Sequence, residues 1–414
     1  MARGVLADAR CRERLDAMLA RVETAQALEV LDDGDFERAL AELGPRQGRP
    51  RVGLEARGRP KALVAFGMLG PGRDPTSRAG GAEDEIFPGY SWRELRDGRE
   101  QAAEHGVRCQ TAIEIQSAVG CPFDCAYCPY GSFVSLRLDV EHIVERVTAL
   151  VRGHPDQTLW KLNNRSDTLG LEPEYGLARA LVERFAELDG PTLMLYSKGD
   201  AVEHLTGLAH GGRTVACFTL TPDRVAALVE AGAPGPQARI AALGALDRAG
   251  YPTRVRLSPV VPLVGWPEAY AELVERVAEA GAPELVTLWT LSMIDFAELG
   301  AIVPLERLYP EVLAEARAAA DTLRGDKGAP FPPATRARIY RELIATVRAR
   351  LPRARVSLCL ESPAVWDTVG ALRSLGGGAG FVCNCGPRVT PEALRLVELG
   401  RPRRRARRDR LPGW

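Results

Sequence analysis

The sequence predicts an α/β protein built on a parallel β-sheet that is either open or closed into a barrel. Short apolar segments alternate with amphipathic segments from residue 113 to residue 288. This alternation is typical of parallel strands joined by right-handed helical crossovers. Ligands of such sheets bind at the carboxyl ends of the strands. We therefore expect the functional residues in the loops that follow the strands.

The six predicted strands are short and apolar, and they cover Ile113–Gln116, Leu159–Leu162, Leu193–Ser197, Val215–Leu220, Thr253–Leu257 and Leu285–Leu288. The segments between them carry apolar residues at helical spacing. The predicted helices cover Val140–Val151, Glu174–Leu188, Asp200–Leu208, Pro222–Glu230, Gln237–Ala249 and Pro267–Ala280.

Both ends of the chain carry further predicted elements. Residues 8–45 have the apolar spacing of two helices, Lys61–Gly67 resembles a strand, and residues 71–90 have the composition of a loop. After the sheet we expect helices over Pro304–Arg324 and Pro333–Arg350 and a strand over Arg355–Leu360. We divide the chain into an N-terminal helical and irregular extension (1–105), the α/β region (106–300), a C-terminal helical region with a cysteine-containing segment (301–400) and a basic tail (401–414).

The charges of the chain balance, with 54 Lys and Arg residues against 54 Asp and Glu residues. Only Arg401–Arg410 is strongly basic, a run typical of a solvated tail and less often of a contact to nucleic acid. The first residues lack the apolar segment of a signal peptide, and no run of about eighteen apolar residues follows. We expect a cytoplasmic protein without membrane contact. Six of its nine cysteines are clustered at two places, which is typical of metal ligands or catalytic thiols and not of a disulfide framework.

The segment Ser117–Gly131 carries the clearest chemical pattern, SAVGCPFDCAYCPYG. It places Cys121, Cys125 and Cys128 in a CxxxCxxC arrangement. Three soft thiolates at this spacing can bind three irons of a [4Fe-4S] cluster and leave the fourth iron open. The open iron can chelate S-adenosylmethionine (SAM), whose reductive cleavage gives a 5'-deoxyadenosyl radical. Tyr127 supplies a ring on which adenine can stack.

The two alternative roles for these cysteines are a zinc site and a thioredoxin-like redox pair. Zinc sites normally use two paired knuckles, and no second knuckle with that spacing follows. A thioredoxin-like redox pair of Cys125 and Cys128 would leave Cys121 without a role. The CxxxCxxC pattern with an aromatic residue before the last cysteine closely resembles that of the radical SAM superfamily.

This resemblance implies a partial (β/α)6 barrel of parallel strands, here with helical N- and C-terminal extensions. Polar residues near the strand ends then become candidate SAM contacts: Ser166, Lys198, Thr219 and Arg256. A cation or hydroxyl from Lys198, Ser166 or Arg256 can bind the SAM carboxylate. Each residue alone could equally be an ordinary helix cap.

A narrower resemblance covers roughly residues 120–290. In the segment Arg213–Leu273 an AGYP turn, a strand ending in a proline pair and a GWPEAY segment follow in the order found in the spore photoproduct lyase family. The resemblance implies that the three cysteines bind the cluster and that Ser166, Lys198 and Thr219 contact SAM. It also implies a hydrogen-donating cysteine where this chain has Asn164, whose N–H bond is too strong for that role. Either another thiol substitutes, or the reaction differs.

A second group of thiols, Cys359, Cys383 and Cys385, lies near the C-terminus. Three roles stay open for it: an additional metal site, a hydrogen-donating thiol, or buried structural cysteines. Cys11, Cys109 and Cys217 are predicted to be structural.

The sequence thus predicts a radical SAM enzyme that resembles spore photoproduct lyase. By family analogy the substrate is damaged DNA, and a donor such as flavodoxin or ferredoxin supplies the electron. The alternatives are a radical SAM enzyme that modifies a peptide or small metabolite and, from another class, a non-catalytic zinc-stabilised nucleic-acid-binding protein. The sequence assigns no catalytic residue.

Overall fold

The computed structural model describes residues 1–21, 27–46, 63–70, 85–87, 90–370 and 382–386. Its centre is an eight-stranded sheet with the strand order β13-β12-β11-β10-β9-β8-β5-β4. These strands are β4 (Arg93–Arg96), β5 (Ala112–Ile115), β8 (Leu159–Leu162), β9 (Thr192–Ser197), β10 (Thr214–Leu220), β11 (Thr253–Val260), β12 (Leu285–Thr290) and β13 (Arg355–Leu358).

All neighbouring strands from β5 to β13 pair in parallel, and β4 pairs with β5 in antiparallel orientation. The order in the sheet follows the order in the chain, and in the described residues β4 and β13 do not pair with each other. The sheet is therefore an open barrel. This confirms the predicted α/β fold, a partial barrel of parallel strands with helical additions. The sheet gains β4, which was not predicted, and the strand predicted over Arg355–Leu360 joins it as β13.

The sheet has an apolar face and a polar face, because side chains alternate along each strand. Phe218, Val255, Val286 and Val356 form one row across β10 to β13, and all four belong to the hydrophobic core. The residues that follow them, Thr219, Arg256, Thr287 and Ser357, form a polar row on the opposite face. The polar face is the interior of the barrel.

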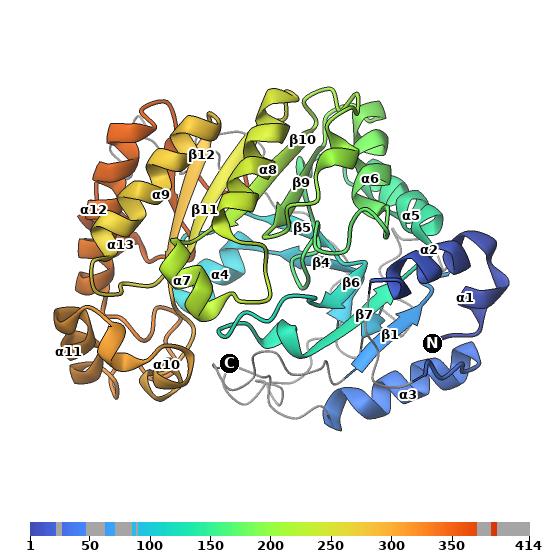
Figure 1. Ribbon diagram of the computed structural model, residues 1–414, viewed down its shortest axis with the longest axis horizontal. Helices are drawn as coiled ribbons and strands as arrows, with labels where there is room; N and C mark the ends of the chain where they lie inside the picture. The colour runs from blue at the N-terminus through green and yellow to red at the C-terminus, as the bar shows by residue number, and fades with distance from the viewer. Residues whose placement is uncertain (22–26, 47–62, 71–84, 88–89, 371–381, 387–414) are drawn as a thin grey trace.

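Helices cover the outer, apolar face of the sheet (Figure 1). They are α5 (Val140–Gly153), α6 (Leu177–Glu187), α8 (Pro236–Arg248), α9 (Trp266–Ala280) and α12 (Pro333–Arg350), whereas α7 (Asp223–Val229) lies at the carboxyl end of the sheet. In α5, Ile143, Val147 and Leu150 recur at helical spacing and are buried, which gives the helix its sheet-facing side. The prolines at the start of α8 and α12 occupy positions where a helix needs no N–H donor.

A smaller layer lies beside the barrel on the N-terminal side (Figure 1). It contains α1 (Gly4–Ala7), α2 (Ala9–Leu19), α3 (Asp33–Arg46), β1 (Leu63–Gly67), β2 (Glu85–Phe87) and β3 (Tyr90–Ser91). The helix α4 (Gly98–His105) lies instead beside the C-terminal part of the barrel, where Lys327 donates to the Gln101 side chain at 2.6 Å. The strand β1 joins β7 (Phe133–Arg137) and β6 (Ala118–Gly120) in a three-stranded sheet. The cysteine segment connects β6 to β7, and it includes the 3₁₀ turn η3 (Pro129–Ser132).

Two predicted helices were wrong in extent. In place of a helix over Asp200–Leu208 the chain forms only the 3₁₀ turn η4 (Glu203–Leu205), because Gly207 disfavours continuation and the Tyr251 hydroxyl donates to the Leu205 carbonyl oxygen. The predicted helix over Pro304–Arg324 is divided at Pro310, which has no N–H to continue a helix. Its region contains η5 (Leu305–Arg307) and α11 (Pro310–Ala318).

Short helices that the sequence pattern did not predict include α4, α10 (Phe296–Ile302) and α13 (Pro363–Thr368). A capping box of Asp295 and Glu298 starts α10, and the Ser362 side chain caps α13.

Several predictions lie outside the described residues: the basic run 401–410, the glycine-rich turn 376–380 and most of the loop 71–90. The domain boundaries remain a prediction, although β1 and β4 both pair with strands beyond residue 105. Within the described ranges, the structure contains no helix of the length and apolar character needed to cross a bilayer.

Candidate functional site

The three motif cysteines lie on one closed loop between β6 and β7. The Cys121 N–H donates to the Tyr130 carbonyl oxygen at 2.7 Å, and the Cys128 N–H donates to that of Cys125 at 3.0 Å. Gly120 enters the loop with φ of +87°, and a Cβ there would lie 2.0 Å from the Phe133 carbonyl oxygen. Only glycine satisfies both conditions.

Other loops at this end of the barrel press against the cysteine loop. The Ala126 N–H donates to the Val229 carbonyl oxygen at 2.8 Å, at the end of α7. A Cβ on Gly232 would lie 2.7 Å from the Asp124 nitrogen, so glycine is needed for this close approach. The loop is thus held against the carboxyl end of the sheet, where the sequence predicted it.

Two of the cysteines favour the neutral thiol in this environment. Burial raises the pKa of Cys125 to about 12, although Lys198 lowers it, and burial also raises the pKa of Cys121. Binding of iron would therefore displace protons, because thiolates are the ligands. Among the described residues no three His, Cys, Asp or Glu side chains surround a point where one metal ion could bind. In a cubane each thiolate binds a different iron, so a cluster requires the three sulfurs to reach three separate irons.

A buried carboxylate, Glu230, connects the cysteine loop to the strand ends. Its side chain is fully buried and accepts hydrogen bonds from Tyr127 at 2.6 Å, Thr221 at 3.0 Å and Arg239 at 2.7 Å. The Lys198 ammonium lies 3.8 Å from it and 5.6 Å from the centre of the Tyr127 ring. Burial raises the pKa of Glu230, but Lys198 and Arg239 lower it more, so the group is ionised. Glu230 was not among the predicted site residues.

Asp167, a polar residue that follows β8, is a second positioning group. One carboxylate oxygen accepts from the Ser197 hydroxyl at 2.5 Å and from the Gly170 N–H at 2.9 Å. The other accepts from the Lys198 N–H at 2.6 Å. The loop after β8, which carries Ser166, is therefore tied to the end of β9, which carries Lys198.

Three predicted SAM contacts carry a buried polar atom without a hydrogen-bond partner in the described part of the chain: Ser166 Oγ, Thr219 Oγ1 and Arg256 Nε. Buried polar atoms are nearly always paired, so each unpaired one requires an explanation. A bound polar ligand would supply hydrogen-bond partners to these three atoms. The donor set therefore fits a molecule with carboxylate, amino and ribose groups.

Arg256 lies deeper in the barrel than its predicted position near a strand end, because β11 continues to Val260. Its guanidinium donates to the Tyr196 hydroxyl at 2.5 Å and lies 3.5 Å from Cys359 Sγ. The Tyr196 and Trp289 rings flank it at 4.9 and 5.4 Å.

Asn164 lies in a charged group on the other side of the interior. Its amide oxygen accepts from the Lys161 ammonium at 2.9 Å, and Lys161 also lies 3.3 Å from Glu114. Arg96 binds the same carboxylate at 3.0 Å.

The C-terminal thiols lie inside the barrel. Arg254 donates to the carbonyl oxygens of Asn384 and Gly386 at 2.8 and 2.7 Å, which fixes residues 382–386 across the interior. The sulfur of Cys383 lies within hydrogen-bond reach of Cys109 and Cys385. Cys109, Cys217 and Cys11 are buried. Whether Cys359, Cys383 and Cys385 bind a metal remains a prediction.

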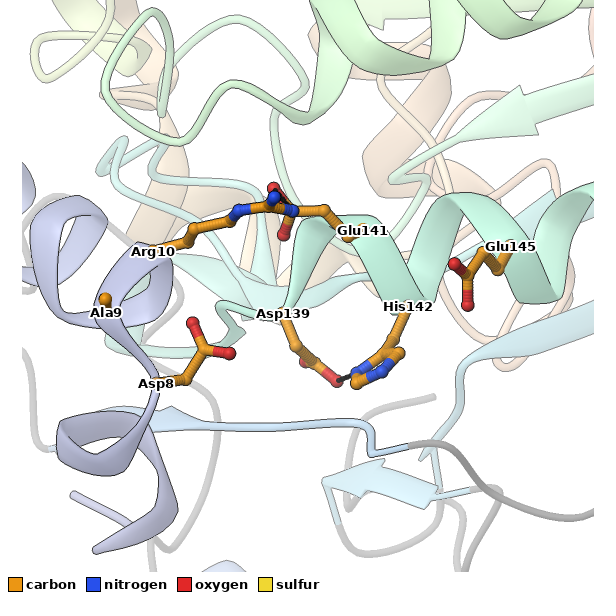
Figure 2. A pocket seen from close by; sticks show the side chains of 7 residues that line it. All are labelled: Asp8, Ala9, Arg10, Asp139, Glu141, His142 and Glu145. Atoms are coloured by element: carbon orange, nitrogen blue, oxygen red, sulfur yellow. Dashed lines mark ion pairs between the residues drawn. The ribbon is translucent and has the colours of Figure 1, made fainter.

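A polar surface hollow elsewhere contains none of the predicted site residues. Figure 2 shows its lining, Asp8, Ala9, Arg10, Asp139, Glu141, His142 and Glu145, from the start of α2 and from α5. Asp139 lies 3.5 Å from His142 and accepts the N–H groups of Leu69 and Gly70 at 2.7 Å. These contacts join the N-terminal layer to the barrel, which gives the carboxylate a structural role.

Comparison with known proteins agrees with the geometry. The sequence model of the family described as "Spore photoproduct lyase" matches residues 107–311, which span the cysteine loop and most of the barrel. The chain belongs to a spore photoproduct lyase-like family of radical SAM proteins. The predicted family resemblance is thereby confirmed.

Members of the spore photoproduct lyase family align with part of the chain. The spore photoproduct lyase of Bacillus subtilis (strain 168) is 28% identical over 177 residues, which cover 41% of this chain and 52% of the relative. The spore photoproduct lyase of a Geobacillus species (strain Y412MC61) is 23% identical over 215 residues, which cover 50% of this chain and 61% of the relative. The chain thus matches a little over half the length of these relatives.

A solved structure of a spore photoproduct lyase mutant, with bound AdoMet and dinucleoside spore photoproduct, has the same fold. It superposes with a TM-score of 0.57 at 14% identity, over 87% of this chain and 97% of the mutant chain. The shared fold therefore extends beyond the segment in which the sequences align.

Proposed function

We propose that this chain is a radical SAM enzyme whose [4Fe-4S] cluster is held by Cys121, Cys125 and Cys128. When bound, the cluster supplies the electron that cleaves SAM and the vacant iron that chelates it. The observation that carries the proposal is the coincidence of the three-cysteine loop with the unpaired buried hydroxyls of Ser166 and Thr219. AdoMet bound in the related lyase structure supports it.

Four side chains would bind and orient SAM. Tyr127, held by Glu230, offers its ring to adenine. Lys198 is positioned by Asp167 through the backbone and by Glu230 through its ammonium group, and it suits the SAM carboxylate. The hydroxyls of Ser166 and Thr219, which have no hydrogen-bond partner among the described residues, suit polar groups of SAM. Burial at this end of the barrel excludes water, which would otherwise compete for these groups.

The proposed substrate is damaged DNA, as the names of the relatives suggest. A dinucleoside spore photoproduct occupies the related lyase structure, which supports a nucleic acid as substrate class. Asn164, bound to Lys161, cannot donate a hydrogen atom, so we propose that the reaction uses a different donor from the one implied by the family. We further propose a flavodoxin- or ferredoxin-like electron donor and a reducing cytoplasm, which suits nine cysteines without disulfides.

The test is anaerobic reconstitution with iron and sulfide, followed by SAM and a strong reductant. Wild type should bind iron and sulfide in equal amounts and release 5'-deoxyadenosine. Cys125→Ala should lose the visible absorbance of the cluster and the product together. Cys11→Ala is the matched control, because that thiol is equally buried but lies in α2, and it should behave as wild type.

Product formation by Cys125→Ala at the wild-type rate would refute the cluster assignment. Zinc alone in the anaerobically purified protein would favour the non-catalytic alternative. Cleavage of SAM that is stimulated by peptides and not by irradiated DNA would favour the runner-up, an enzyme that modifies a peptide.

A further inference from the structure

The polar row on the interior face contains more unpaired atoms than the SAM contacts explain. Thr219, Arg256 and Thr287 are aligned in register on β10, β11 and β12. The exposed fractions of their side chains are 1%, 6% and 1%. Thr219 Oγ1, Arg256 Nε and Thr287 Oγ1 all lack a hydrogen-bond partner in the described residues. Such a row of buried polar atoms is the expected form of a binding surface before its ligand arrives.

Within the described residues Arg256 has no carboxylate partner, in contrast to three other buried arginines. Arg239 binds Glu230, Arg254 binds Glu284, and Arg336 binds Glu361. The contacts of Arg256 in the described chain are a tyrosine hydroxyl, a thiol and two aromatic rings. A buried cation without a counter-charge is costly, so an anion from outside the chain would relieve this cost.

We propose that Arg256 and Thr287 bind a phosphodiester group of a nucleic-acid strand, and that the Trp289 ring stacks on a neighbouring base. The proposal rests on the function proposed above and assigns Arg256 to the substrate instead of SAM. Guanidinium binds phosphate through two parallel N–H donors, and the Nε edge of Arg256 is unused. Trp289 and Tyr196 provide the aromatic surfaces that single-stranded nucleic acids use.

The position of the row is suitable for a substrate beside SAM. Neighbouring strands lie about 4.8 Å apart, so Thr219 and Thr287 are separated by about 10 Å. Thr219 marks the proposed SAM side. At the opposite end Ser357 donates to the Val382 carbonyl oxygen at 2.8 Å, so the C-terminal segment covers the row there. Tyr196, Trp289 and Cys359, around the guanidinium, are each partly exposed, which gives a ligand access.

The test measures binding of the dinucleotide thymidylyl-thymidine to the anaerobically reconstituted protein by calorimetry. A second probe is its methylphosphonate analogue, which keeps both bases and removes the charge. Wild type should bind the charged probe at least about tenfold more tightly. Arg256→Gln should abolish this preference, and Arg256→Lys should retain part of it. Arg276→Gln is the control, because Arg276 lies at the surface and pairs with Asp223.

Equal affinities of wild type for the two probes would overturn the proposal, as would an unchanged preference in Arg256→Gln. Preference for an acidic dipeptide over the dinucleotide, lost in Arg256→Gln, would replace nucleic acid by a carboxylate ligand. The proposed radical chemistry fails separately, since its readout is 5'-deoxyadenosine from wild type without any nucleic acid. Wild type that releases none, yet shows Arg256-dependent binding, would remove the chemistry and keep the anion site.

Discussion

The interior face of the barrel has two halves with different charge balance. In the paired half, formed by β4, β5 and β8, Arg96 and Lys161 share the carboxylate of Glu114. Arg165, after β8, binds Glu94 at 3.0 Å. In the open half, formed by β10, β11 and β12, Arg256 has no carboxylate partner in the described chain, and two threonine hydroxyls are unpaired.

This difference separates what holds the barrel together from what is available to ligands. The charges of the paired half already satisfy one another, so a ligand there would have to break existing ion pairs. The unpaired polar groups of the open half would gain hydrogen bonds or a counter-charge from a ligand, and no ion pair of theirs would have to break. Binding residues should therefore be sought in the open half, and residues important for stability in the paired half.

The largest effect is expected from Glu114→Gln, which breaks the paired half. The buried Lys161 and the half-buried Arg96 would lose their shared counter-charge, and the free energy of unfolding should fall by about 3–5 kcal/mol. Thr287→Val in the open half is the matched control and should leave it unchanged or raise it by about 1 kcal/mol, because an unpaired hydroxyl is removed. Urea unfolding checks both.

The loss of stability in Glu114→Gln has a defined pH dependence. Burial raises the pKa of Glu114, but Arg96 and Lys161 lower it more, to about 2 from the ordinary 4.5. A carboxyl group with a lowered pKa stabilises the fold above its unfolded-state value and loses this contribution as the pH falls. The difference between wild type and Glu114→Gln should be constant between about pH 5 and 8 and shrink below about pH 4.5. A difference that grows toward low pH would contradict the ion-pair account.

Arg256→Met in the open half should change the free energy of unfolding less than Glu114→Gln does, and in the opposite direction. A buried cation without a carboxylate partner is replaced by an apolar chain, so the free energy of unfolding should stay constant or rise by about 1–2 kcal/mol. Arg239→Met should instead lower it, because Glu230 would lose a partner at 2.7 Å. Destabilisation of Arg256→Met as large as that of Arg239→Met would show that the two halves do not differ.

The smallest effect concerns Lys327, which lies close to the paired half. Burial and the nearby charge of Arg96 lower the pKa of Lys327 to about 8 from 10.5. The pKa of Lys161 is raised, since burial lowers it less than its neighbours, including Cys385 and Glu114, raise it. In ¹³C-labelled protein the Lys327 Cε resonance should titrate near pH 8, and that of Lys161 should not. Lys327→Gln identifies the resonance.

The sign of the Lys327 contribution follows from its lowered pKa. Between about pH 8 and 10.5 the folded chain has released this proton and the unfolded chain still binds it, so stability from this group rises with pH. Lys327→Gln should remove that part of the rise. Titration of Lys327 near 10.5 would mean that the side chain is solvated instead of packed in the protein.

Much of the fold followed from local patterns. The apolar runs of β8 and β9 and the helical spacing of α12 predicted those elements, because their burial is encoded in neighbouring residues. The strands β4, β6 and β7 were not predicted. The segment of β4, Arg93–Arg96, is polar, and β6, Ala118–Gly120, is only three residues long. Such segments become strands only when a partner strand is beside them.

The sequence by itself determined the cysteine loop, because CxxxCxxC is a local spacing, and it determined which strand ends carry polar side chains. Only the tertiary structure decided that Glu230 binds Tyr127 and Arg239, that Asp167 joins two loops, and that Arg256 lies without a carboxylate partner in the described chain. The reason is physical. Pairing of buried charges depends on residues from strands far apart in the chain, and no local spacing records which of them meet.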